Sequence, residues 1–184
     1  IEKILSVIDT ASPVGKRNYA MFLLIARMGL RISDVVGLKL SHIDWMKNCI
    51  SFSQQKTGNN LSLPLSKEVG MAIVSYLRDG RPPSTADVVF VGHNAPFAPL
   101  AKHNNFNSEL RSYLRRAGIE IPKEKHTGMH TLRHSFASNM LKSGTTVQEI
   151  SQILGHSSIS STETYLRVDL DQLRLCSLNC EVLI

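Results

Sequence analysis

The chain has 184 residues and a mass of 20.4 kDa, a size that favours one domain around a single buried core. Its net charge of +6 and pI of about 9.4 favour a polyanionic partner, either a nucleic acid or an acidic membrane surface. We find no apolar run near the roughly 20 residues of a membrane span and no signal peptide, so we expect neither a membrane-spanning nor a secreted protein.

The cysteines are three in number and lack the spacing of a zinc site. Cys176 and Cys180 are four residues apart and would share a helix face, but two thiols make an incomplete metal site. We therefore expect Cys49, Cys176 and Cys180 to be incidental thiols in a reducing compartment, with no metal or other cofactor and a cytoplasmic location. The sequence opens at Ile1 and not at a methionine, so we expect a fragment of a longer protein.

The first helices follow from apolar spacing. Apolar residues around 4–8 predict an amphipathic helix that is closed by the Ser12-Pro13 turn. Residues 20–28 are almost all apolar and predict a buried helix that ends at Gly29, a good C-terminal capping residue.

Arg31 follows this glycine. Because Ser33 can cap a short helix through Leu38, Arg31 falls in the tight corner between two helices, where its position would be well fixed. Its guanidinium group could bind a phosphate, or it could hydrogen-bond the carbonyls at the end of the helix that stops at Met28. Taken alone, the two interpretations have equal weight.

A small β region comes next. Residues 50–52 and 61–63 alternate between apolar and polar, and residues 56–60 have turn chemistry, which predicts a hairpin with Lys56 near its tip. Pro64 indicates that the returning strand ends there or lies at a sheet edge. Lys56 alone would be a solvated surface lysine.

The remaining pattern is helical with one exception. It predicts helices over 66–78, 104–117 and 130–141 and a short strand over 88–91. Together the elements predict an α+β fold that is mainly helical, with a small antiparallel β-sheet or hairpin.

Two capping boxes mark the last helices. Thr146 and Glu149 have the spacing of a capping box, and the helix that follows ends at Gly155. A second box at 160–163 places Tyr165 in the first turns of another short helix.

His130 and Arg133 are three residues apart on a predicted helix, so their side chains project from the same side. Two donors aimed one way suit a phosphate, whose oxygens arginine contacts with its planar fork. A surface pair without function is the favoured alternative for these two residues alone. His156 alone would end a helix, and Tyr165 alone would be a packing residue.

Taken together, the six residues favour a different interpretation. In chain order they are Arg31, Lys56, His130, Arg133, His156 and Tyr165. A phenol that attacks a phosphate held by cationic groups would break and rejoin nucleic-acid strands. The order resembles that of the tyrosine recombinase (phage integrase) family, whose catalytic domain matches about residues 1–168. The matching motifs are GLRISD with Arg31, QKTG with Lys56, HTLRHSFA with His130 and Arg133, LGHS with His156, and STETY with Tyr165.

The resemblance implies that residues 1–184 form a tyrosine recombinase catalytic domain, with a C-terminal tail over about 169–184. On this resemblance, we expect the family's N-terminal core-binding domain to be absent from this sequence. The implied activity is that of a site-specific DNA recombinase or integrase, which cleaves DNA through a 3′-phosphotyrosine intermediate without metal or ATP. The element it serves, whether phage, transposon or chromosome, stays open.

The resemblance also implies a role for each residue. Tyr165 would be the nucleophile, Arg31 and Arg133 would stabilise the transition state, and Lys56 would be the general acid. His130 would manage the tyrosine proton, His156 would donate to the phosphate, and Asp34 would orient a basic neighbour.

Double-stranded DNA is the implied partner, with self-association into a tetrameric synapse. Arg111, Arg115 and Arg116, with Tyr113, form a basic helical face that could follow the DNA backbone or could simply be solvated. The tail over 169–184 could pack on its own domain or on a neighbouring protomer.

Two other functions stay open. A type IB topoisomerase uses a similar residue set and would relax DNA as a monomer. A non-catalytic helix-turn-helix DNA-binding module would explain residues 145–166 but has no need of Tyr165. The step of nine residues from His156 to Tyr165 favours the recombinase.

Overall fold

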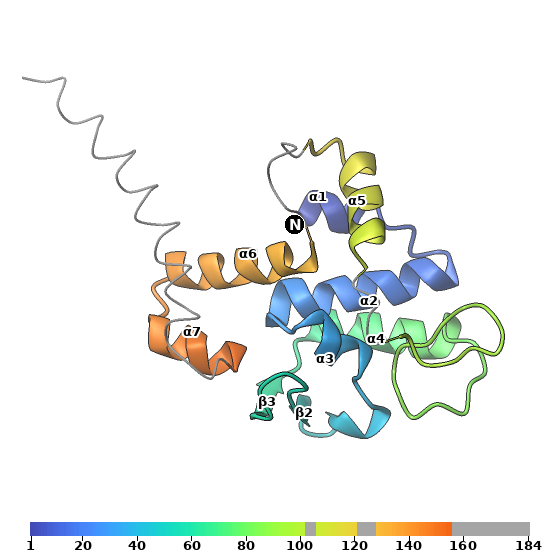
Figure 1. Ribbon diagram of the computed structural model, residues 1–184, viewed down its shortest axis with the longest axis horizontal. Coiled ribbons are helices and arrows are strands. Elements are labelled where there is room, and N and C mark those ends of the chain that lie inside the picture. Colours follow the sequence, from blue (N-terminus) through green and yellow to red (C-terminus); the bar gives the residue numbers. More distant parts are fainter. Residues whose placement is uncertain (102–105, 121–127, 156–184) are drawn as a thin grey trace, which may run out of the picture.

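The structure is a computed structural model that describes residues 1–101, 106–120 and 128–155. Figure 1 shows the arrangement of its helices and of a small sheet. The helices are α1 (Glu2–Ser6), α2 (Pro13–Met28), α3 (Ile32–Val36), the 3-10 helix η1 (Leu40–His42), α4 (Lys67–Asp79), α5 (Asn107–Arg116), α6 (Met129–Lys142) and α7 (Val147–Leu154). The strands are β1 (Ile43–Asp44), β2 (Cys49–Ser53) and β3 (Asn60–Pro64). The predicted α+β, mainly helical class is confirmed.

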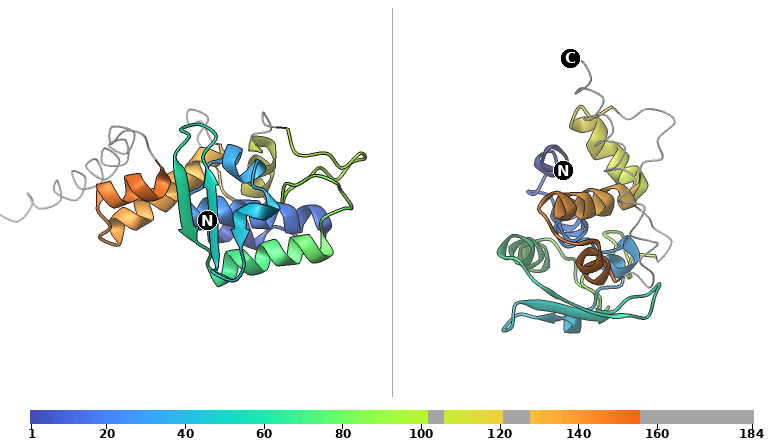
Figure 2. Two further views of the ribbon diagram at one scale, coloured as in Figure 1. Left: turned by 90° about the horizontal axis from the view of Figure 1, so that it is seen from below. Right: turned by 90° about the vertical axis from the view of Figure 1, so that its left-hand side faces the viewer.

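The elements lie in layers around α2. Figure 2 shows the sheet at one end of the molecule, α2 and α6 in the middle, and α1 and α5 at the opposite end. Helix α2 packs against α4 on one side and α6 on another, and it also contacts α1 and α3. This central position explains why the apolar residues from Ala20 to Ala26 are buried on every side of the helix.

Helix α2 begins earlier than predicted. Its N-cap is Ser12, whose hydroxyl accepts a hydrogen bond from Gly15 N at 3.1 Å, and Pro13 occupies the first helical turn. The Ser12-Pro13 pair therefore starts a helix, and the expected start at residue 20 was wrong. The added turns contain two buried polar residues, Arg17 and Asn18. The Arg17 guanidinium group donates hydrogen bonds to Asn18 Oδ1, and Asn18 Nδ2 donates to the Tyr113 hydroxyl.

The corner after α2 is built around a left-handed glycine. Gly29 has φ 66°, and its N–H donates to carbonyls of the last α2 turn, which confirms the predicted cap. The following helix α3 has Arg31 as its N-cap, so Ser33 lies inside the helix and its predicted capping role was wrong. Arg31 occupies the corner between α2 and α3, as predicted.

The hairpin is confirmed, with one strand more than expected. Strand β2 pairs with β3 in antiparallel register, with Ile50 opposite Leu63 and Phe52 opposite Leu61, and these residues face the core. Strand β1 adds to the other side of β2, which leaves β3 at an edge with Pro64 as its last residue.

Two predictions downstream need correction. Residues 88–91 are buried but form only isolated bridges, Lys39 with Val88 and Val91 with Pro99, and not a strand. The basic helix begins at Asn107 and not at 104, a start that lies outside the described residues. Helix α4 agrees with its prediction within one residue at each end.

Helix α7 has the predicted capping box. The Thr146 hydroxyl accepts from Glu149 N at 3.3 Å, and the Glu149 carboxylate accepts from Thr146 N at 2.8 Å. The helix ends at Gly155, which has φ 62°. The second predicted box at 160–163 lies outside the described residues.

In residues 1–101, 106–120 and 128–155, no helix is long and apolar enough to cross a membrane. The same ranges hold no group of three or more His, Cys, Asp or Glu side chains that could bind a metal ion.

We predict that Gly29→Ala destabilises the fold more than Gly118→Ala. A Cβ at Gly29 would lie 2.6 Å from Phe136 Cδ1 and 2.7 Å from Leu154 Cδ2, whereas Gly118 has nearly the same φ, 65°, with no described atom within 4 Å. Backbone strain alone should lower the free energy of unfolding by about 1 kcal/mol, and the added clash by about 1–3 kcal/mol more. Urea unfolding of both variants measures the difference. Equal losses would show that the corner can repack around a methyl group.

Candidate active site

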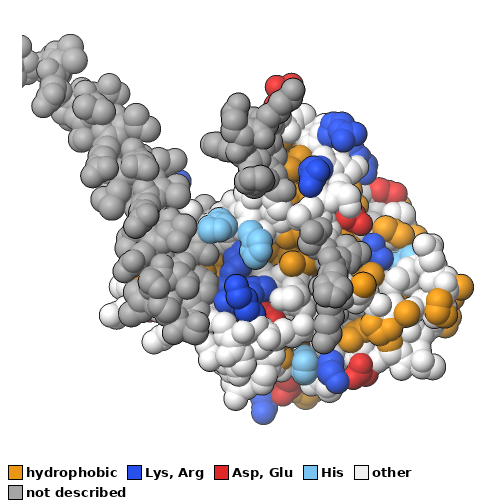
Figure 3. Space-filling model, in the orientation of Figure 1, with side chains coloured by type: hydrophobic (Ala, Val, Ile, Leu, Met, Phe, Trp, Pro, Cys, Tyr) orange, Lys and Arg blue, Asp and Glu red, His pale blue; other side chains and the backbone are white. Residues whose placement is uncertain are grey.

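Basic side chains gather on one face of the molecule. Figure 3 shows Lys, Arg and His side chains together where α6 meets the corner between α2 and α3. Arg31 comes from this corner and Arg133 from the buried side of α6. Both reach the C-terminal end of α7, so three elements far apart in the sequence meet at the two guanidinium groups, here called the arginine pair.

Arg133 bridges two helix ends. Its side chain is 4% exposed, Nη1 donates to Gly29 O, and Nη2 donates to Leu154 O at 2.8 Å. Carbonyls at helix C-termini lack intrahelical partners and carry partial negative charge. The guanidinium group therefore fixes the ends of α2 and α7 to each other. The interpretation of His130 and Arg133 as a simple surface pair is excluded for Arg133 by its burial.

Arg31 is held less tightly. Its Nη2 donates to Gly155 O at 3.5 Å, and its Nη1 lies 4.0 Å from Asp34 Oδ2. Among the described residues, Nη1 has no hydrogen-bond partner. The carbonyl at the α2 end, which we considered as a partner for Arg31, is instead bound by Arg133. Nη1 is buried beside the Asp34 carboxylate, so Arg31 is placed by one long hydrogen bond and one long ion pair.

Asp34 joins the corner to the hairpin. Its side chain is fully buried, and its Oδ1 accepts a hydrogen bond from Gln55 N at 3.0 Å. Burial raises the pKa of the Asp34 carboxyl, and the Gln55 N–H and the charges of Arg31 and Arg133 oppose this shift. Its Oδ2 lies 4.0 Å from Arg31 Nη1, and the role of orienting a basic neighbour stays a prediction.

Lys56 lies in the loop between β2 and β3. It is exposed and occupies the middle of a turn over residues 55–57. Gln55, directly before it, is fixed to Asp34 through its backbone N–H. The predicted place of Lys56 near the hairpin tip is confirmed, and the hairpin is attached to the element that carries Arg31.

His130 is the second residue of α6 and is exposed, in contrast to Arg133 one turn later. The start of α6 is fastened to α5, because Met129 N donates to Asn107 Oδ1 at 3.2 Å. His134, one turn after His130, is also exposed. Partial desolvation lowers the pKa of the His134 imidazole, with smaller contributions from His130 and Arg133, which favours its neutral form.

His156 and Tyr165 lie outside the described residues, as do Cys176, Cys180 and the tail over 169–184. Gly155, which precedes His156 in the sequence, lies against the arginine pair through its carbonyl oxygen. Four of the six candidates, Arg31, Lys56, His130 and Arg133, are therefore placed on elements that contact one another.

Gln54 was missed by the sequence analysis. It is 2% exposed, and its Nε2 donates to Leu154 O at 3.0 Å, beside the Arg133 contact. The available signal was strand alternation, since Ile50 and Phe52 face inward from β2 and Gln54, directly after the strand, continues the same alternation. A polar residue that continues an inward-facing row requires buried partners.

The basic face of α5 is only partly as predicted. Arg111, Arg115 and Arg116 are exposed, but Tyr113 is buried, with its hydroxyl accepting from Asn18 Nδ2 at 3.0 Å. The Tyr113 ring packs edge-on against Phe22 at 5.5 Å between centroids, so its expected place on this face was wrong.

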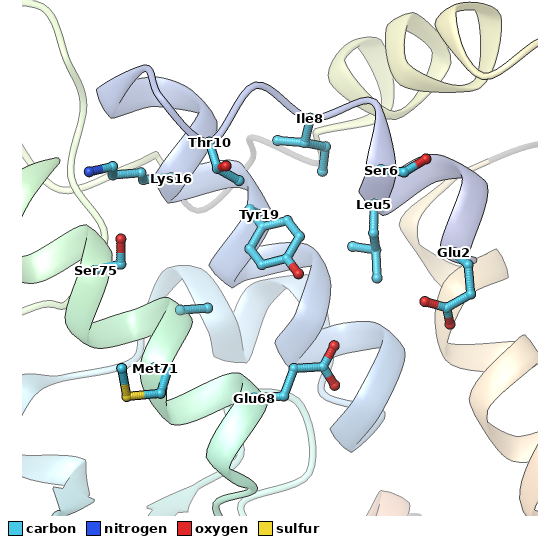
Figure 4. Close-up of a pocket in the computed structure, with 11 residues that line it drawn as sticks. Glu2, Leu5, Ser6, Ile8, Thr10, Lys16, Tyr19, Glu68, Met71 and Ser75 are labelled. Carbon is cyan, nitrogen blue, oxygen red and sulfur yellow. The ribbon is translucent and has the colours of Figure 1, made fainter.

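A cavity of about 800 Å³ lies between α1, α2 and α4. Figure 4 shows Leu5, Tyr19 and Glu68 projecting into it. Two carboxylates, Glu2 and Glu68, line it and form ion pairs with Arg27 at 2.9 and 3.1 Å. None of the four candidates that the structure describes, Arg31, Lys56, His130 and Arg133, lines this cavity, and its acidic groups disfavour a phosphate.

The sequence matches the phage integrase family over residues 1–171. A Sinorhizobium fredii protein named as an integrase/recombinase, y4rA, is 41% identical over 97% of this chain and 42% of its own length. A second one from the same organism, y4gC, is 36% identical over 97% of this chain and 92% of its own length. The chain thus spans less than half of one relative and nearly all of the other.

The fold also matches a solved structure. The XerH site-specific recombinase, in a post-cleavage complex with a palindromic difH substrate, superposes with a TM-score of 0.76 at 22% identity. The match covers 96% of this chain and 50% of that one. At this identity the likeness establishes the fold, and the predicted catalytic-domain fold is confirmed.

We predict that Asp34→Ala is more destabilising than Asp34→Asn. Alanine leaves the Gln55 N–H without its acceptor, which should lower the free energy of unfolding by about 1–3 kcal/mol, whereas asparagine keeps an oxygen in reach. Urea unfolding at neutral pH measures both. Equal stability of the two variants would show that the Gln55 hydrogen bond contributes nothing.

As the pH rises, the free energy of unfolding of the Asp34→Asn variant should also increase relative to that of the natural protein. Because the pKa of Asp34 is raised in the folded state, the folded state holds the proton more tightly than the unfolded state. The contribution of Asp34 to stability is therefore fully present below the ordinary pKa and declines as the pH rises through the raised value. Unfolding measured across this range should show the difference in stability moving in favour of the variant. A difference that moves the opposite way would mean that the charges of Arg31 and Arg133 outweigh burial.

Proposed function

The chain belongs to the phage integrase family, and we propose that it is the catalytic domain of a site-specific recombinase that cleaves and rejoins DNA strands. The observation that carries the proposal is the arginine pair, held at the end of α7 immediately before His156. Two fixed guanidinium groups in one place suit a phosphodiester, whose non-bridging oxygens gain negative charge in the transition state.

Tyr165 is the proposed nucleophile. Its phenol oxygen attacks the scissile phosphorus, the bond to the 5′ oxygen breaks, and a 3′-phosphotyrosine and a free 5′-hydroxyl result. A phenol has a pKa of about 10, so its anion forms far more readily than that of an alkyl alcohol and also leaves readily. The link retains the energy of the phosphodiester, and a 5′-hydroxyl from another strand can reverse the attack without ATP.

The arginine pair supplies the stabilising charge. Arg133 is oriented by carbonyl oxygens at two helix ends, which fix the guanidinium group without removing its charge. Arg31 brings a second positive charge to the same end of α7, where its Nη2 donates to Gly155 O at 3.5 Å. No step in this scheme needs a metal ion or another cofactor.

The remaining groups move or hold protons. Lys56, on the hairpin loop, protonates the departing 5′ oxygen, and His130, at the exposed start of α6, takes the proton of the Tyr165 phenol. His156 donates a hydrogen bond to the phosphate. Asp34 orients Arg31 and connects it to the loop that carries Lys56.

Double-stranded DNA is the proposed substrate. Support comes from the net charge of +6 and from the XerH structure of the same fold, which is bound to its difH substrate. We propose that the exposed Arg111, Arg115 and Arg116 contact the DNA backbone. Recombination joins two sites, so the protein should assemble as a tetramer on DNA, in the cytoplasm where the DNA lies.

A covalent adduct tests the proposal. With a nicked suicide duplex and a chelator present, the protein should form a product that resists denaturation, and Tyr165→Phe should abolish it. Denaturing gel electrophoresis with labelled DNA measures the adduct. DNA that is retarded in a native gel but never covalently bound would instead indicate a binding module. An adduct that persists in Tyr165→Phe would place the nucleophile elsewhere.

Loss of either arginine should slow cleavage. Arg31→Ala and Arg133→Ala should each reduce the single-turnover rate by about a hundredfold or more, since each removes a charged contact to the transition state. Thermal unfolding of each variant, monitored by circular dichroism, separates loss of catalysis from loss of the fold. Arg31→Ala is the sharper test because Arg31 makes the weaker structural contacts. A folded Arg31→Ala variant that cleaves at the natural rate would contradict the assignment.

The α5 arginines should contribute to the salt dependence of DNA binding. Each phosphate contact adds about 0.9 to the slope of log affinity against log salt, so replacing Arg111, Arg115 and Arg116 by alanine should lower the slope by up to about 3. A control that replaces the exposed Lys47, Lys67 and Arg78 removes the same charge elsewhere. If both variants lower the slope equally, the effect is one of overall charge and α5 has no special place.

A further inference from the structure

Gln54 is a buried amide at the start of the loop that joins β2 to β3. It follows β2 directly and is 2% exposed, whereas Gln55 and Lys56 are exposed. A buried primary amide needs partners for both its donor and its acceptor atoms. The partners it has connect the Lys56 loop to the end of α7.

The side chain bridges two segments. Its Nε2 donates to Leu154 O at 3.0 Å, and its Oε1 accepts from the Thr57 hydroxyl at 2.8 Å. Thr57 is the residue after Lys56. One amide group therefore connects the last carbonyl of α7 to a neighbour of the proposed general acid.

The backbone of Gln54 closes the same loop. Its carbonyl accepts from Gly58 N and its N–H donates to Asn59 O, each at 2.9 Å. Gln55 N, in turn, donates to Asp34 Oδ1 at 3.0 Å. Lys56 is thus the one exposed cation of a loop whose residues before and after it are fastened to the protein interior.

The other side of the amide faces the arginine pair. Leu154 O accepts from Gln54 and from Arg133 Nη2, at 3.0 and 2.8 Å. Gly155 packs so closely that a Cβ there would lie 2.3 Å from Gln54 Oε1. Leu154 O is therefore a shared acceptor that sets the position of Gln54 relative to Arg133.

We propose that Gln54 is a positioning residue that holds the Lys56 loop in a fixed relation to the arginine pair. The inference rests on the proposed function, in which Lys56 protonates the leaving 5′ oxygen. Because Lys56 is on an exposed turn, its ammonium group reaches the leaving atom reliably only if the loop is fixed. Gln54 provides that fixation at the point nearest the site.

The proton transfer can be isolated by changing the leaving atom. With the natural substrate, the P–O5′ bond breaks as Tyr165 oxygen bonds to phosphorus, and Lys56 gives its proton to the 5′ oxygen. With a sulfur atom in place of the 5′ bridging oxygen, the P–S bond breaks and a thiolate leaves. A thiol has a pKa of about 8.5, so the thiolate needs no proton to depart. Variants that impair the general acid should therefore cleave the sulfur substrate at close to the natural rate. Variants of the arginine pair should remain slow with it.

The main variant is Gln54→Met, which keeps the length and volume of the side chain but loses both hydrogen bonds. Single-turnover cleavage of matched suicide duplexes with oxygen or sulfur at the 5′ bridge gives the rates. Lys56→Ala should slow oxygen cleavage by about a hundredfold or more, and Gln54→Met by about tenfold or more. Both should cleave the sulfur substrate at close to the natural rate, which also shows that the variants are folded.

Three controls complete the design. Thr57→Val removes the hydrogen bond to Gln54 Oε1, together with a long one from Asn59 N at 3.5 Å, and should give a smaller loss, again confined to oxygen. Ser53→Ala removes an outward-facing hydrogen bond to Asn60 in the same hairpin and should cleave both substrates at the natural rate. Arg31→Ala should be slow with both.

Two results would overturn the inference. If Gln54→Met cleaves the oxygen substrate at the natural rate, or is equally slow with both substrates, Gln54 does not position Lys56. If Lys56→Ala itself is not restored by sulfur, the role of Lys56 in the proposed function fails and the inference fails with it. Failure of the Gln54 inference alone and failure of the proposed role of Lys56 therefore give different patterns of cleavage rates.

Discussion

The guanidinium group of Arg133, buried between two helix ends, is the contact on which the site depends. It joins the carbonyls of Gly29 and Leu154, so the ends of α2 and α7 lie at one point although they are far apart in the sequence. Both helices end in left-handed glycines, which let the chain turn away directly after the carbonyl that Arg133 binds. The corner that carries Arg31 and the turn that precedes His156 are therefore fixed by the same side chain.

The hydrophobic core holds the elements that carry this site in place. Helix α2 is surrounded by α1, α3, α4 and α6, so its last turn has little freedom to move. Strands β2 and β3 turn Phe52 and Leu61 toward the core, and this register places Gln54 on the same inward side. The hairpin and the helical corner thus meet at two polar side chains, Gln54 and Asp34, whose buried atoms bind backbone groups.

Much of the fold could be predicted from the sequence pattern, and the predictions that were wrong have physical explanations. The hairpin, α4 and the capping box of α7 were predictable because alternation, turn residues and cap spacing agree locally. The start of α2 was missed because Arg17 and Asn18 interrupt the apolar run, yet they are buried and satisfy each other's hydrogen bonds. Residues 88–91 are apolar like a strand, but they find only single bridging partners in the surrounding loops.

The sequence indicated which residues to consider for the candidate site, but it did not indicate how deeply each side chain is buried. Spacing placed His130 and Arg133 on one side of a helix, but it could not show that one is exposed and the other is almost fully buried. That difference depends on packing against α2 and α7. Gln54 was overlooked because polarity was taken as a sign of exposure, although strand parity pointed inward.

The acceptors that orient the arginine pair belong mainly to the main chain. Gly29 O, Leu154 O and Gly155 O exist whatever side chains surround them, provided that the two glycine turns are kept. Sequence drift around the proposed catalytic centre can therefore replace neighbouring side chains without removing the atoms that orient its guanidinium groups. Under the proposed function, such a centre would keep its chemistry constant while the DNA sites that it recognises diversify.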